Sequence, residues 1–306
     1  MAGVFEGFAT IGILIALGIL LAHLGIIDAA GQRTLSMLAF YVASPALLLT
    51  VLESSDVADV FSGALVATLV AVLATAFVFA VVAALRHEPL GEAVVGTLCS
   101  AYVNAGNLGL PIAAYVLGDP AFVAPVLLLQ LLFLQPLALV LLDVDASATR
   151  LPWHSILLRP VKNPITIGSL LGLLLTITDT RIPGVVHDPL DLVGGMAVPS
   201  MLLAYGVSLR LGPLPGRGVA VGRLGLVVGL KMVLQPVVAY LVGRYLLDLA
   251  TPELLAVTVL SALPTAQNVF VIASRYERAS LLARDAIFVS TLASVPVVML
   301  ITALIV

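Results

Sequence analysis

Two short polar stretches interrupt long apolar runs of this chain, and they are the places where the sequence offers chemistry. The first is Asn104-Ala-Gly-Asn-Leu-Gly-Leu-Pro111, and the second is Pro264-Thr-Ala-Gln-Asn268. Proline has no N–H to donate and clashes with the carbonyl four residues before it, so both stretches are expected to break a helix. The amide side chains beside each proline need hydrogen-bond partners in an apolar environment. Together these features predict a polar site built from two broken helices.

Each break would leave the N-terminus of a half-helix inside the apolar layer. The free N–H groups and the positive end of the helix dipole favour an anion there, while unwound carbonyls can hold a cation such as sodium. We therefore predict a binding site for a small organic anion. The candidate substrate-binding residues are Asn104, Asn107, Gly109, Pro111, Pro264, Thr265, Gln267 and Asn268. The alternative is that these amides only join helices, at under about 1 kcal/mol each.

Lys231 is the one Lys or Arg that the apolar pattern places well inside a run, since Arg244 lies at the end of the same run. We interpret it either as a lysine that packs in the core or reaches the surface, or as a counter-ion for the substrate. The 17 Asp and Glu residues all fall outside the middle of the runs, which argues against a cation/proton antiporter because such proteins keep an intramembrane carboxylate. Proton coupling through Asp119 or Asp285, near the ends of runs, stays open, as does a sodium ion held by the breaks.

Enzymatic motifs are absent from the sequence. The four histidines are far apart, and no His-Glu-x-x-His, Gly-x-Ser-x-Gly or phosphate-binding glycine loop occurs. We expect neither a metal cofactor nor an enzyme, since an intramembrane enzyme would need a catalytic pair within the runs. A ligand-gated receptor or channel on the same fold is the remaining alternative, and saturable flux would distinguish a carrier from it.

The elements that must position these residues are membrane-spanning helices. The 306 residues are 61% hydrophobic and only 10% charged, with a mean hydropathy of +1.19, whereas soluble proteins carry about 25% charged residues. Each apolar run approaches the roughly 20 residues that cross a bilayer. The runs are residues 8–24, 34–52, 62–85, 93–117, 122–142, 163–178, 192–209, 224–247, 252–274 and 286–306. We predict an all-α membrane protein of ten transmembrane helices, the fourth and ninth of which are broken.

The distribution of basic residues predicts the orientation in the membrane. Eleven of the 14 Lys and Arg follow the odd-numbered runs, namely Arg33, Arg86, Arg150, Arg159, Lys162, Arg210, Arg217, Arg223, Arg275, Arg278 and Arg284. By the positive-inside rule these loops face the cytoplasm and both termini lie outside the cell membrane. Membrane topology therefore explains these scattered charges, and we expect no nucleic-acid partner.

Matching prolines indicate an internal repeat. Pro45 and Pro199, and likewise Pro111 and Pro264, are separated by nearly the same stretch, about half the chain. A repeat of five spans is odd in number, so the second copy must be inverted in the membrane. The predicted parts are residues 1–142 as the first repeat, 143–162 as a cytoplasmic connecting loop, and 163–306 as the second repeat. Interrupted helices at matching places in inverted repeats indicate the binding site of a transporter.

Two further patterns concern helix shape and packing. Prolines inside the runs at positions 45, 136, 199, 236 and 296 are expected to kink helices. The motifs Gly168-x-x-x-Gly172 and Gly225-x-x-x-Gly229 predict close contact between helices.

The two break motifs resemble those of a known family. Asn104 to Ile112 and Ala262 to Tyr276 are similar to the fourth-span and ninth-span motifs of the auxin efflux carrier family, and Lys162-Asn-Pro164 and Lys231 fit as well. The resemblance covers nearly the whole chain. It implies a fold similar to that of the bile acid:sodium symporters, in which helices 1, 2, 6 and 7 form a scaffold and helices 3–5 and 8–10 form a mobile core.

The resemblance also implies a mechanism and a class of substrate. The substrate would bind where helices 4 and 9 cross at Pro111 and Pro264, and the core would move past the scaffold by elevator-type alternating access, in a homodimer joined by the scaffold. Plant members export auxin, and bacterial relatives carry small carboxylates such as malate or malonate. The short 143–162 loop is typical of a bacterial-type member, so we predict a secondary transporter of a small organic anion. The alternative is an ion-coupled symporter of the bile acid:sodium type.

Overall fold

The computed structural model describes residues 2–53, 63–109, 112–113, 117–118, 120–147, 164–178 and 180–305, and within these the chain is all-helical apart from turns and one isolated bridge. Helices long and apolar enough to span a membrane are Ala29–Glu53, Gly63–Leu85, Pro125–Asp145, Gly184–Leu211, Val221–Leu246 and Ser280–Ile305. Shorter apolar helices are Gly12–His23, Leu90–Ala101, Pro164–Ile177 and Thr251–Ser261. Each predicted run therefore contains a helix, and the all-α membrane class is confirmed.

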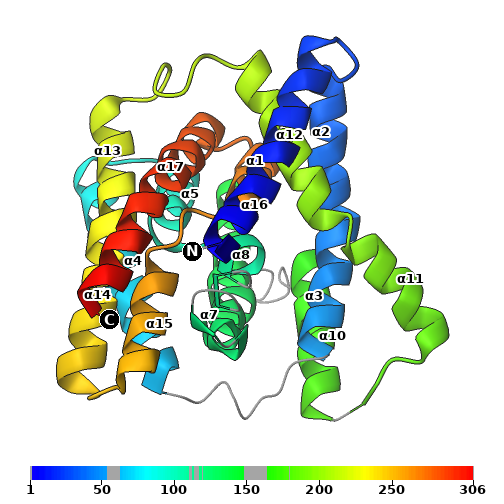
Figure 1. The fold of residues 1–306 in the computed structure, drawn as a ribbon. Helices are drawn as coiled ribbons and strands as arrows, with labels where there is room; N and C mark the ends of the chain where they lie inside the picture. Colours follow the sequence, from blue (N-terminus) through cyan, green and yellow to red (C-terminus); the bar gives the residue numbers. More distant parts are fainter. Residues whose placement is uncertain are drawn as a thin grey trace.

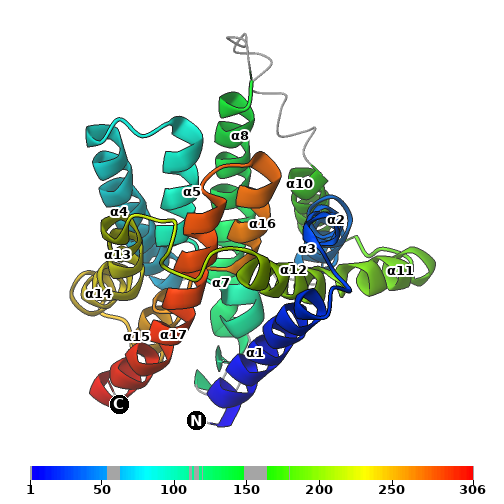
Figure 2. The same cartoon turned by 90° about the horizontal axis from the view of Figure 1, so that it is seen from above.

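The helices form two groups that lie side by side. Figure 1 shows α2, α3, α10, α11 and α12 together on the right and α4, α13, α14 and α15 on the left, and Figure 2 keeps the same separation from above. The first helix group comprises α1 (Ala2–His23), α2 (Ala29–Leu38), α3 (Ser44–Glu53), α10 (Pro164–Ile177), α11 (Gly184–Gly194) and α12 (Ala197–Leu211). The second helix group comprises α4 (Gly63–Leu85), α5 (Leu90–Ala101), α7 (Ala124–Leu129), α8 (Gln135–Asp145), α13 (Val221–Gly229), α14 (Gln235–Leu241), α15 (Thr251–Ser261), α16 (Gln267–Tyr276) and α17 (Ser280–Ile305).

Three of the prolines expected to kink helices each follow a single π-helical turn. The turns η1 (Ala39–Ala43), η6 (Gln130–Leu134) and η8 (Leu230–Leu234) each end two residues before a proline. A π-turn inserts one residue into the helix and shifts its hydrogen bonds to the i→i+5 pattern. This shift accommodates the hydrogen bond that proline cannot make. The residue between each turn and its proline is thereby directed into the bundle, and two of these residues, Gln135 and Gln235, are buried.

Glycines bring helices of the first group into backbone contact. A Cβ added to Gly18 of α1 would collide with the carbonyl oxygen of Leu203 in α12. A Cβ added to Gly172 of α10 would lie 3.0 Å from the carbonyl oxygen of Leu49, so the close helix contact predicted for the Gly168–Gly172 motif is confirmed. The prediction for Gly225 and Gly229 is wrong, because an added Cβ on either would meet nothing within 4 Å.

Gly18→Ala is expected to destabilise the protein, because α1 and α12 must separate to admit the methyl group. Overpacking of this kind costs about 1–3 kcal/mol. Gly12→Ala is the matched control, since the same helix has open space there and alanine is intrinsically the better helix former. Thermal unfolding of the purified variants tests the difference, and equal unfolding temperatures would show that the α1–α12 contact is not tight.

The structure corrects several predicted boundaries. The last helix begins at Ser280 rather than at 286, the seventh run begins at Gly184 rather than at 192, and α8 continues to Asp145, into the predicted connecting loop. Residues 148–163 of that loop lie outside the described residues, as do Pro111 and Asp119. Arg284 and Asp285, which hydropathy excludes from a span, lie inside α17 because they neutralise each other as a buried pair.

Candidate functional site

The two predicted breaks lie against each other. After α5 and α15 end, residues 102–104 and 264–266 become extended and run antiparallel, and we call these six residues the crossing. Its pairing consists of the bridge between Val103 and Thr265 and of hydrogen bonds from Asn104 N to Pro264 O (2.8 Å) and from Ala266 N to Tyr102 O (3.3 Å). The prediction that both stretches interrupt a helix is therefore confirmed for the described residues.

The crossing satisfies backbone groups that broken helices would leave unpaired. Pro264 has no N–H but supplies its carbonyl oxygen to Asn104 N. On the other segment, the π-turn η3 (Ala105–Gly109) begins directly after the crossing, and the N–H groups of Leu108 and Gly109 both donate to Asn104 O, at 3.2 and 3.1 Å. Irregular backbone at membrane depth survives only where protein or water provides partners, so this exchange explains why the two breaks occur together.

A cavity of about 190 Å³ lies on one face of the crossing. It separates the crossing from α3, α10 and α12 of the first helix group, whose apolar side chains, such as Leu48, Ile165 and Met201, form its far wall. Its polar wall contains Tyr102, Asn104, Gln130, Gln135, Gln267 and Asn268. Sites for drug-sized ligands measure roughly 300–1,000 Å³, so this cavity suits a small molecule.

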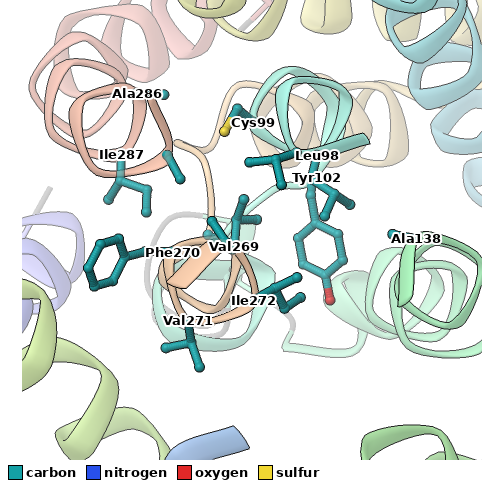
Figure 3. Packing of buried hydrophobic residues seen from close by; sticks show 14 of the residues in the cluster. Leu98, Cys99, Tyr102, Ala138, Val269, Phe270, Val271, Ile272, Ala286 and Ile287 are labelled. Atoms are coloured by element: carbon teal, nitrogen blue, oxygen red, sulfur yellow. The ribbon is translucent and has the colours of Figure 1, made fainter. Parts of the chain in front are cut away.

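The polar wall combines a fixed hydrogen-bond network with unused groups. Gln135 Oε1 accepts hydrogen bonds from the Tyr102 hydroxyl at 2.8 Å and from Asn268 Nδ2 at 3.2 Å. In Figure 3 the Tyr102 ring lies between Ile272 of α16 and Ala138 of α8, with its hydroxyl directed away from Cys99. Asn104 Nδ2, Gln130 Oε1 and Asn268 Oδ1 are buried without a hydrogen-bond partner. An unpaired buried polar atom costs about 1–3 kcal/mol, so this donor and these two acceptors are candidates for contact with a ligand.

Away from the cavity, hydrogen bonds tie the crossing to neighbouring helices, and a second set of hydrogen bonds holds the buried lysine. Thr265 Oγ1 donates to the Cys99 carbonyl oxygen at 2.6 Å, and Thr265 N donates to Ser290 Oγ at 3.1 Å. Lys231 Nζ donates to Gln235 Oε1 at 2.6 Å, and Gln235 Nε2 donates to the Ala101 carbonyl oxygen at 3.1 Å. The described lining of the cavity does not include Lys231, which is linked through Gln235 to the end of α5.

The predicted site residues thus fall into distinct places. Asn104, Gln267 and Asn268 line the cavity. Thr265 instead donates a hydrogen bond to the Cys99 carbonyl, and the Pro264 carbonyl accepts one from Asn104 N. A Cβ on Gly109 would lie 3.4 Å from Val123 and 3.5 Å from Leu263, so this glycine packs away from the cavity. The Asn107 side chain and Pro111 lie outside the described residues.

Sequence reasoning missed the glutamines and the tyrosine of the site. Tyr102, Gln130 and Gln135 line the cavity, and Gln235 links Lys231 to α5. One signal was present: a Gln-Pro dipeptide occurs at 135–136 and again at 235–236, inside two apolar runs. A glutamine in such a run needs a partner, and its recurrence beside a proline indicates a shared local structure.

The remaining charged groups lie away from the cavity. Arg284 Nε donates to Asp285 Oδ1 at 2.8 Å, and Asp285 Oδ2 accepts from Gly216 N at 2.8 Å, so this carboxylate is paired with a guanidinium and a loop. Coupling through Asp285 stays a prediction, and Asp119 lies outside the described residues. Within the described part of the chain no three His, Cys, Asp or Glu side chains come together as metal ligands would.

Comparison with known proteins adds independent information. A family model described as "Membrane transport protein" matches residues 4–302. A protein of Rhizobium meliloti (strain 1021) named "Putative malonate transporter" is 29% identical over 303 residues, which cover 93% of this chain and 90% of that protein. An "Uncharacterized transporter" of Methanothermobacter thermautotrophicus is 26% identical over 303 residues, 95% of each chain. The similarity therefore spans both breaks and both helix groups.

Proposed function

The chain belongs to the membrane transport protein family, the auxin efflux carrier family that its break motifs resemble, and from this we propose that it is a secondary transporter of a small organic anion. As a member of that family it is a multi-pass membrane transporter. The observation that carries the substrate proposal is the small cavity at the crossing, where Asn104, Gln130 and Asn268 each present a buried polar atom without a partner.

Electrostatics at the cavity favour an anion. No side chain caps the N-terminus of α16, and its first residues, Gln267 and Asn268, line the cavity. The positive end of a helix dipole attracts negative charge. No Asp or Glu occurs in the described lining, so no charged side chain there repels a carboxylate, and Asn104 Nδ2 is an unpaired donor for it. The cavity size and the name of the Rhizobium relative together favour a short dicarboxylate such as malonate.

The position of the cavity supports an elevator mechanism. The cavity lies between the two helix groups, which would act as scaffold and transport core. Within the second group, Arg223 pairs with Glu88 and Glu92 at 2.9 Å each, and Arg278 pairs with Asp145 at 2.7 Å. These pairs join α5, α8, α13 and the turn before α17 into one unit. A core that is tied internally can move as a body past the scaffold and carry the crossing with it.

The membrane arrangement follows from the same proposal. Residues 1–142 and 163–306 would form inverted repeats, and each contributes one extended segment to the crossing. The end of the bundle that carries Arg33, Arg223 and Arg278 would face the cytoplasm, with both termini outside. Two copies would join through the scaffold helices as a homodimer in the cell membrane.

Ligand-dependent thermal stability tests the proposal. Purified protein is heated with mono-, di- and aromatic carboxylates, with malonamide as the uncharged control and a small cationic amine as the charge-reversed control. A ligand at a hundred times its dissociation constant stabilises by about 2.7 kcal/mol, so a small dicarboxylate is expected to raise the unfolding temperature and malonamide is not. Absence of a shift with every carboxylate would refute the anion site, and a shift accompanied by non-saturable flux would favour a channel or receptor.

A further inference from the structure

Lys231 is a fully buried lysine with no carboxylate beside it. Its side chain is 0% exposed, and Gln235 Oε1 is the hydrogen-bond partner of its ammonium within the described residues. An isolated ammonium is costly to bury, and buried charges are normally paired or bound by several polar groups. The residue therefore requires an explanation beyond packing.

The carboxylates on the neighbouring helices are already paired. The turn η8, which carries Lys231, packs against α4, α5 and α17. Helix α4 contains no charged residue, Glu92 of α5 binds Arg223 at 2.9 Å, and Asp285 of α17 binds Arg284. The positive charge of Lys231 is thus not cancelled by any described side chain on these elements.

The charge is connected instead to the end of a broken helix. Gln235 relays Lys231 to the Ala101 carbonyl oxygen, which belongs to the last residue of α5. The C-terminus of a helix carries the negative end of its dipole and attracts cations. In secondary transporters with broken helices, such C-terminal ends and the unwound carbonyls beside them hold the coupling sodium ion or proton. Lys231 therefore supplies a positive charge where a transported cation is otherwise needed.

We propose that Lys231, acting through Gln235, replaces a coupling sodium ion at the end of α5, so that the protein binds its anion without sodium. This inference rests on the proposed anion site for its effect on the substrate. The ammonium lies outside the described lining of the cavity, so its positive charge would attract the anion through low-dielectric protein, where charges interact more strongly than in water. Lys231 is a positioning residue, because it does not touch the cavity.

The test compares sodium dependence in the wild-type protein and in two variants. Malonate is the probe, and its dissociation constant is measured in sodium chloride and in choline chloride. The wild type is expected to bind equally in both salts. Lys231→Ala, which leaves room for an ion, is expected to bind at least tenfold more weakly in choline and to recover at least threefold in sodium. Lys231→Met, which fills the same volume, is expected to stay weak in both salts.

Several results would overturn the inference. The inference is refuted if the wild-type protein binds malonate only in sodium, and this measurement does not depend on the folding of any variant. Unchanged malonate affinity in both variants would equally show that Lys231 only packs. If the wild type binds no carboxylate, the proposed function fails, and the inference is then judged on ligand-free protein. Sodium should still raise the unfolding temperature of Lys231→Ala and not that of the wild type, and the lack of this difference would refute the replacement.

Discussion

Replacement of both Asn104 and Asn268 by alanine is expected to weaken binding of the transported anion strongly and to leave the protein folded. Both residues line the cavity, where Asn104 Nδ2 is an unpaired donor and Asn268 Oδ1 is an unpaired acceptor. A hydrogen bond from Asn104 to a carboxylate contributes about 1.5–3 kcal/mol, and one from a neutral ligand group to Asn268 about 0.5–1.5 kcal/mol, so loss of both is expected to weaken binding by roughly thirtyfold or more. Uptake into proteoliposomes should fall to the level of empty vesicles, and calorimetry should show the loss of affinity directly.

The matched control is an amide outside the cavity. Gln32 of α2 is partly buried, bonds to Ser36 and does not line the cavity, so Gln32→Ala should retain uptake. The single variant Asn268→Ala should be weaker than Asn104→Ala, because it also removes a donor from Gln135 Oε1. Flux in the double variant that remains close to wild type would show that the substrate binds elsewhere.

The sequence was sufficient to locate the crossing but not to orient its side chains. Asn104 and Pro264 are recognisable because amides and proline are rare within apolar runs, and the near-equal spacing of the prolines suggested that the breaks correspond. Thr265 was predicted to bind substrate, yet it faces Cys99, away from the cavity. In an extended segment successive side chains point to opposite faces, so its direction depends on the pairing of Val103 with Thr265, which no local pattern reveals.

The rest of the site depends on distant helices and on paired charges. Gln130 and Gln135 reach the cavity because η6 adds a residue before Pro136, and sequence patterns do not distinguish such a π-turn from a proline kink. Arg284 and Asp285 were excluded from the last span because hydropathy scores each charge separately. In the structure their opposite charges form a buried ion pair. Gly212 leaves room for the Arg284 guanidinium, because a Cβ at that position would collide with it. Such compensation is visible only after the helices have packed.

A covalent link between Arg33 and Glu277 is expected to stop transport without preventing anion binding. Arg33 Nη2 lies 3.3 Å from Glu277 Oε1, and this is the one ion pair between the two helix groups among the described residues. Two other side-chain hydrogen bonds in the described part of the chain join the groups, from Arg275 to the Tyr41 hydroxyl and from the Tyr205 hydroxyl to the Arg284 carbonyl oxygen, and neither joins two charged groups. If the second group must slide past the first, α2 and the turn after α16 have to separate in each cycle.

The experiment uses Arg33→Cys and Glu277→Cys joined by a cleavable bifunctional thiol reagent. Both side chains are accessible, with exposures of 75% and 71%, whereas the native Cys99 is fully buried and should not react. Uptake should fall at least tenfold on linking and return on cleavage, while the ligand-induced thermal shift persists.

The control joins Asp145→Cys to Arg278→Cys, a pair inside the second group, and should leave uptake intact because these residues move together. Normal uptake by the protein with Arg33 and Glu277 linked would mean that the two groups do not move past each other at this end. Equal inhibition by both links would mean that the second group does not move as one body.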